Sequence, residues 1–98
     1  MIRSVAFHEA AVVELNDAAD FYNLECPGLG LTFLGEIESA LATIGQFPEA
    51  TPLLHGRVRR KILPRFPYAI IYSYRDEQIR VLAIAHEKRR PFYWRGRR

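Results

Sequence analysis

The chain has 98 residues, 49% of them hydrophobic and 26% charged, with a formal net charge of +3. Such a chain forms one small folded domain, residues 1–98, and is too apolar to be disordered. It has no apolar run near the ~20 residues of a membrane span and no signal-peptide pattern, so we expect a cytoplasmic protein. The single cysteine, Cys26, excludes an internal disulfide and should be a small buried residue; we expect no metal or other cofactor.

The charge is distributed unevenly along the chain. Residues 1–50 carry one basic residue and eight acidic ones, a net of −7, whereas residues 51–98 carry thirteen basic and three acidic ones, a net of +10. A cationic half that also contains aromatic residues and a histidine indicates a docking surface for a polyanion or an acidic peptide.

The first half of the chain predicts a strand followed by two helices. Residues 2–7 are a short β-compatible run. Apolar residues then recur with helical spacing until Pro27 and Gly28 end the first helix, and a second helical pattern closes near Gly45. The helical faces are Ala11, Leu15, Ala18, Ala19 and Tyr22 in the first helix, and Phe33, Ile37, Ala40, Leu41 and Ile44 in the second. The short break between them predicts an antiparallel helical hairpin.

The second half of the chain predicts three strands, over residues 57–63, 68–75 and 79–86. In the first of these, Val58 and Ile62 alternate with Arg57, Arg59 and Lys61, and Arg60 interrupts the pattern on the apolar side. The predicted order is β-α-α-β-β-β, an α+β domain whose helical hairpin packs on one face of a small, mostly antiparallel sheet. We therefore expect the acidic residues on the helices and the basic residues on the uncovered sheet face.

The residues best suited to chemistry lie at the end of the last strand. A metal-independent ribonuclease needs a base for the 2′-hydroxyl proton, cations beside the phosphate and a proton donor for the leaving oxygen. His86, Arg89 and Tyr93 could supply these roles. A second set of basic and aromatic residues could bind a target or a partner, namely Arg57, Arg59, Lys61, Arg65, Arg90 and Trp94.

Each of these residues also has a plainer interpretation. His86 could make a structural hydrogen bond at its strand end, Trp94 could pack against the domain, and the arginines at the C-terminus could be solvated. The helical carboxylates Glu14, Asp17 and Asp20 are interpreted as a solvated face rather than a metal site.

Several stretches of the chain resemble the RelE/ParE superfamily of type II toxin-antitoxin modules. These stretches are residues 5–11, 59–72 and 81–91, with Phe-Pro-Tyr-x-Ile-x-Tyr at residues 66–72 and His-x-x-Arg-Arg-Pro-x-Tyr-Trp at residues 86–94. The motifs occur in the order and spacing typical of the family, and the resemblance covers the whole chain. The resemblance implies the β-α-α-β-β-β fold predicted above.

The resemblance favours the ParE-like branch, also described as plasmid stabilization proteins. It implies a toxin that inhibits DNA gyrase and is neutralised by a cognate antitoxin whose acidic C-terminal segment folds on it, with DNA bound only through the antitoxin. A RelE-like, ribosome-dependent mRNA endoribonuclease is the alternative, in which His86, Arg89 and Tyr93 would be catalytic. An inactive toxin fold that acts as a binding module is a second alternative. Whether the protein is an enzyme is left open, with a non-enzymatic toxin favoured.

Overall fold

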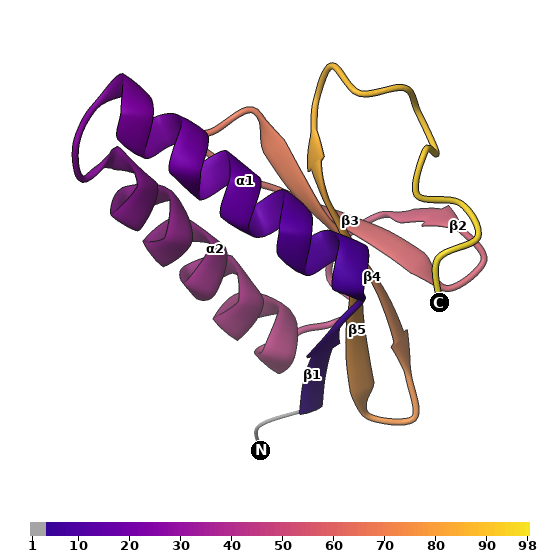
Figure 1. The fold of residues 1–98 in the computed structure, drawn as a ribbon. Coiled ribbons are helices and arrows are strands. Elements are labelled where there is room, and N and C mark those ends of the chain that lie inside the picture. Colours follow the sequence, from indigo (N-terminus) through magenta and orange to yellow (C-terminus); the bar gives the residue numbers. More distant parts are fainter. Residues whose placement is uncertain (1–3) are drawn as a thin grey trace.

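The computed structural model describes residues 4–98 as two helices and one five-stranded sheet (Figure 1). The elements are β1 (Ser4–Phe7), α1 (Glu9–Glu25), α2 (Leu29–Gln46), β2 (Leu53–His55), β3 (Val58–Ile62), β4 (Tyr68–Arg75) and β5 (Gln78–His86). The strand order is β1-β5-β4-β3-β2, with β1 parallel to β5 and the other neighbours antiparallel. Ile2 and Arg3 of the predicted first strand lie outside the described residues.

The predicted α+β architecture is confirmed, with one strand more than expected. The additional strand, β2, is three residues long and pairs with the start of β3 at the edge of the sheet. It follows Pro52 and has no alternation of its own, so only its pairing with β3 makes it a strand.

Local chemistry explains where the helical hairpin begins and turns. The His8 side chain caps α1 by accepting a hydrogen bond from the Ala10 N–H at 3.0 Å. The chain reverses at Gly28, whose φ of 90° is a left-handed conformation that glycine adopts without a steric penalty. Two residues later, Gly30 lies directly against α1, where its N–H donates to Asn23 Oδ1 at 2.8 Å. The prediction that Cys26 is buried is wrong, because it caps the end of α1 in an exposed position.

The main core lies between the helical hairpin and one face of the sheet. α1 contributes small residues, Ala11, Ala18 and Ala19, which let it approach the sheet closely. The larger side chains of this core come from α2 and the central strands, among them Phe33, Ile37, Ile44, Ile70, Tyr72 and Ile84. We call this covered side of the sheet the helix face.

The opposite side of the sheet, the open face, carries a smaller core beneath the C-terminal segment, residues 87–98. Ile71, Leu82, Ala83 and Trp94 are buried there. Leu82 and Ala83 both reach this face because the β4–β5 register shifts between Ile71 and Tyr72, the irregularity of a β-bulge. The C-terminal segment crosses back over the sheet instead of extending into solvent, as the yellow loop of Figure 1 shows. Within the described part of the chain, neither helix is long and apolar enough to cross a bilayer.

Candidate partner-binding groove

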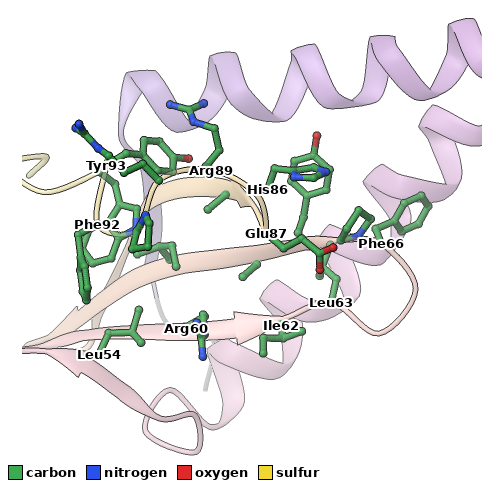
Figure 2. Close-up of a pocket in the computed structure, with 18 of the residues that line it drawn as sticks. Leu54, Arg60, Ile62, Leu63, Phe66, His86, Glu87, Arg89, Phe92 and Tyr93 are labelled. Atoms are coloured by element: carbon green, nitrogen blue, oxygen red, sulfur yellow. The ribbon is translucent and has the colours of Figure 1, made fainter.

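A groove of about 560 Å³ opens on the open face of the sheet. Its floor consists of apolar residues from β2 to β5, including Leu54, Ile62, Ala69, Ile71 and Ala85. The turn between β3 and β4 borders it on one side, and the first half of the C-terminal segment borders it on another. Figure 2 shows Leu54, Arg60 and Ile62 along β2 and β3 on one side of the lining, and Phe92 and Tyr93 of the C-terminal segment on the other side.

The groove combines an apolar floor with a basic rim. Ile62 is 62% exposed and Phe92 is 41% exposed, so both offer apolar surface to a partner in the groove. Arg60, Arg65, Arg89 and Arg90 also line the groove and are exposed, against a single acidic residue, Glu87. Such a surface suits a polypeptide segment that carries apolar anchors between carboxylates.

His86 lies half-buried where β5 ends and the groove meets the helix face. Its Nδ1 accepts a hydrogen bond from the Lys88 N–H at 3.0 Å, and its ring packs edge-on against Tyr68 with centroids 4.9 Å apart. The structural hydrogen bond expected as the plainer interpretation of His86 is therefore present. This contact leaves the proton of a neutral ring on Nε2.

Tyr93 and Arg89 lie together beside α1. The Arg89 guanidinium stacks on the Tyr93 ring at 3.8 Å, and the Tyr93 hydroxyl donates to Glu14 Oε2 at 2.8 Å. Burial raises the pKa of Tyr93 far above its ordinary value, and the hydrogen bond to Glu14 raises it further. The Tyr93 proton is thus held by a protein carboxylate rather than presented to a ligand.

The basic residues of β3 do not share one face. Arg59 and Lys61 pair with Tyr72 and Ile70, whose side chains belong to the core beneath the helices, so both project to the helix face. Arg60 pairs with Ile71 and lines the groove instead. The expectation that Arg59 and Lys61 lie on the open face is therefore wrong.

Arg59 and Arg57 do not line the groove. The Arg59 side chain is only 14% exposed, and its Nη1 donates to the carbonyl oxygens of Glu49 and Thr51 in the connection before β2. Arg57 is exposed in the turn between β2 and β3, outside the groove lining. Arg59 therefore holds a loop in place.

Of the predicted binding residues, Arg65, Arg90 and Trp94 line the groove. Trp94 is 7% exposed, which confirms that it packs against the domain. Arg65 makes an internal ion pair, with its Nε 2.8 Å from Glu36 Oε2, while most of its side chain stays exposed.

Four residues of this region are not among the predicted site residues: Arg60, Glu14, Glu36 and Arg97. Arg60 was visible as the break in the β3 alternation, a charged residue on the side that carried Val58 and Ile62. The prediction that Glu14 lies on a solvated face is wrong, because its side chain is only 14% exposed. Its partner Arg97 is 83 positions away in the sequence, a distance over which no spacing rule applies.

In the described part of the chain, no three His, Cys, Asp or Glu side chains lie close enough together to bind a metal ion. The groove lies on the open face of a small α+β domain. Residues 5–91 match the family described as the ParE toxin of the type II toxin-antitoxin system, parDE. The chain therefore belongs to the ParE toxin family.

A solved structure gives the same fold. A chain of the structure described as the chromosomal ParDE TA system from P. aeruginosa superposes with a TM-score of 0.75 over 87% of this chain and 96% of that one, at 20% sequence identity. At this identity the likeness concerns the fold alone. A search of curated proteins found no match.

Proposed function

We propose that this ParE-family toxin acts by binding a protein target, DNA gyrase, in the cytoplasm, and that a ParD-type antitoxin neutralises it by inserting an acidic segment into the groove. Family membership implies the toxin-antitoxin role and the ParD partner. The groove with its apolar floor and arginine rim carries the proposal for where the antitoxin binds. DNA would be bound only through the antitoxin.

The groove matches an antitoxin segment in both apolar and charge character. Ile62 and Phe92 offer apolar surface that water covers in the free toxin, and burying such side chains stabilises a complex by about 25 cal/mol per Å² of apolar area. Arg60, Arg89 and Arg90 would pair with carboxylates at the rim. A disordered acidic segment that folds on binding can follow a bent surface of this kind.

The geometry supports protein binding over RNA cleavage. The Tyr93 hydroxyl donates to Glu14, and His86 Nδ1 accepts from the backbone, so two of the three candidate catalytic groups already have internal hydrogen bonds. Arg59 and Lys61, which a ribonuclease would be expected to aim at the phosphate, lie on the helix face. Of the three candidate catalytic residues, His86 through its Nε2 and Arg89 are the two whose groups are not already held by an internal hydrogen bond within the described residues.

Expression of the chain with and without its antitoxin, followed by measurement of DNA and protein synthesis, tests the proposal. We expect DNA synthesis to stop first, with DNA damage induction, and toxicity to survive in His86→Ala. Rapid translation arrest with cleaved mRNA, abolished by His86→Ala, would establish the ribonuclease instead, since a general acid or base is worth ~10²–10⁴-fold in rate. Tight antitoxin binding without any growth effect would indicate the inactive binding module.

A further inference from the structure

The two segments that border the groove have little regular structure of their own. Residues 63–67 form the turn between β3 and β4, and residues 87–98 form turns without helix or strand. In the C-terminal segment only Tyr93, Trp94 and Arg97 are not exposed, so these three residues anchor it. Each border must therefore be held in place by contacts to the rest of the molecule.

Glu14 of α1 holds the C-terminal border. Its carboxylate receives both Arg97 guanidinium nitrogens, Nη1 at 2.9 Å and Nη2 at 3.1 Å, and the Tyr93 hydroxyl at 2.8 Å. The Ile84 N–H of β5 donates to the same carboxylate at 3.0 Å. A bidentate guanidinium–carboxylate pair fixes direction as well as distance, so Glu14 ties both the segment and β5 to α1.

Glu36 of α2 holds the other border in the same way. Its carboxylate is 6% exposed and receives the Arg65 backbone N–H at 3.0 Å and the Arg65 Nε at 2.8 Å. A buried carboxylate needs such partners, because an unpaired buried charge is strongly unfavourable. The turn that Arg65 occupies is therefore fixed to the helical hairpin and not only to the strands beside it.

The remaining acidic residues of the hairpin differ from these two. Glu9, Asp17, Asp20, Glu25 and Glu38 are all exposed, and residues 9–46 contain no lysine or arginine. Glu14 and Glu36 can therefore find a cationic partner only outside the hairpin, and in both cases that partner is in a segment bordering the groove.

We propose that Glu14 and Glu36 are positioning residues that set the shape of the groove from behind, by fixing its two borders to the helical hairpin. This inference rests on the proposed function of the groove as the antitoxin site. Neither carboxylate lines the groove, so each acts on the partner only through Arg97 and Tyr93 or through Arg65.

The test uses Glu14→Gln and Glu36→Gln, with Asp17→Asn and Glu38→Gln as matched controls from the same two helices. Amide hydrogen exchange of the full-length toxin reports how firmly each border is held, and titration with the ParD-type antitoxin encoded with it reports affinity. We expect Glu14→Gln to accelerate exchange in residues 92–98, and Glu36→Gln to accelerate it at the Leu63, Arg65 and Phe66 amides, by about tenfold or more, as when hydrogen bonds to a charged group are lost. Each should weaken antitoxin binding by about tenfold, and the controls should change neither measurement.

Two results would overturn the inference. If exchange in the borders is unchanged in both variants, the carboxylates do not hold them. If exchange rises but antitoxin affinity is unchanged, the borders do not shape the site. Should either glutamine variant fail to fold, Arg97→Lys and Arg65→Lys keep the charge but lose the guanidinium geometry, and the same outcomes apply to them.

Failure of the proposed function would look different. A wild-type toxin that does not bind the antitoxin, or binds it equally well after its groove arginines are reversed in charge, would remove the groove as the antitoxin site. Hydrogen exchange would still decide whether Glu14 and Glu36 hold the two segments, because that measurement needs no partner.

Discussion

Tyr93 combines a ring that packs in the small core of the open face with a hydroxyl that donates to a mostly buried carboxylate. The guanidinium groups of Arg89 and Arg97 lie over its ring at 3.8 and 5.2 Å. These contacts join α1, β5 and the C-terminal segment at one side chain. Its role is therefore to hold the segment in place.

The raised pKa of Tyr93 leads to a prediction at alkaline pH. Because the folded state favours the neutral hydroxyl, its contribution to stability is complete below the ordinary tyrosine pKa of about 10 and declines as the pH rises above it. We expect the free energy of unfolding, measured by urea titration, to fall above pH ~10, and to fall less steeply in Tyr93→Phe. Burial also raises the pKa of Tyr22, Tyr68 and Tyr72, so the variant should retain part of the decline. Identical slopes in the two proteins would contradict this account.

At the scale of elements, the helical hairpin depends on the close approach of its two helices at Gly30. A Cβ at this position would overlap the backbone carbonyl oxygen of Ala19, whereas a Cβ at Gly35 in the same helix would meet no atom within 4 Å. Substituting each glycine by alanine therefore distinguishes the effect of steric contact, at Gly30, from that of helix propensity, at Gly35.

We expect Gly30→Ala to destabilise the protein by about 1–3 kcal/mol, because the helices must move apart to accept the methyl group. Gly35→Ala should stabilise it by about 0.5–1 kcal/mol through its better helix propensity. Thermal or urea unfolding of the two variants measures both effects. The explanation fails if the two substitutions shift stability in the same direction.

In the C-terminal segment, two neighbouring aromatic residues are expected to differ in role, one contributing to stability and the other to binding. The Trp94 side chain of this segment is buried against the sheet, and Phe92, whose ring centroid is 5.5 Å from that of Trp94, is 41% exposed at the groove. The first residue belongs to the core and the second to the candidate binding surface.

Trp94→Ala should therefore lower the free energy of unfolding by about 3–5 kcal/mol, as expected for a buried aromatic residue. Phe92→Ala should change stability by less than about 1 kcal/mol but weaken antitoxin binding by about tenfold, as loss of an interface anchor does. Urea unfolding and antitoxin titration of each variant provide the two measurements. Loss of stability in Phe92→Ala equal to that in Trp94→Ala would assign both residues to the core.

The helices and every strand except β2 could be predicted from the sequence, but the side of the sheet to which each β3 side chain points could not. Helical spacing located α1 and α2 because both bury one continuous stripe against the sheet. In β3 the rule that apolar side chains face the core failed, since Val58 and Ile62 lie on the open face with Arg60, and Ile62 stays mostly exposed. Alternation identifies which residues share a face of the sheet. It does not show whether the helices cover that face or whether it stays accessible to a partner.

The candidate site was predicted in part for a similar reason. His86, Arg65, Arg90 and Trp94 follow from local motifs and do line the groove. The contacts of Glu14 and Glu36 join residues 83 and 29 positions apart, and only the folded chain brings them together.

At the scale of the whole molecule, the uneven charge of the sequence becomes a division between two layers. The charged residues of the helical hairpin are all acidic, whereas Arg60 of β3, Arg65 of the following turn, and Arg89 and Arg90 of the C-terminal segment line the groove. Two of the hairpin carboxylates are used internally to hold those arginine-bearing segments. The remaining groove arginines can attract an acidic antitoxin, and association should slow as salt screens this attraction.

The most direct test of the groove compares antitoxin affinity for Arg60→Glu and Arg57→Glu. Both residues are exposed cations, Arg60 in the middle of β3 and Arg57 just before the strand, but only Arg60 lines the groove. We predict that Arg60→Glu weakens antitoxin binding by about tenfold or more, because the new carboxylate would repel the carboxylates of the antitoxin segment. Arg57→Glu should leave the affinity within about twofold of the wild-type value. Equal losses in the two variants, or a loss in Arg57→Glu alone, would contradict the assignment of the groove as the antitoxin site.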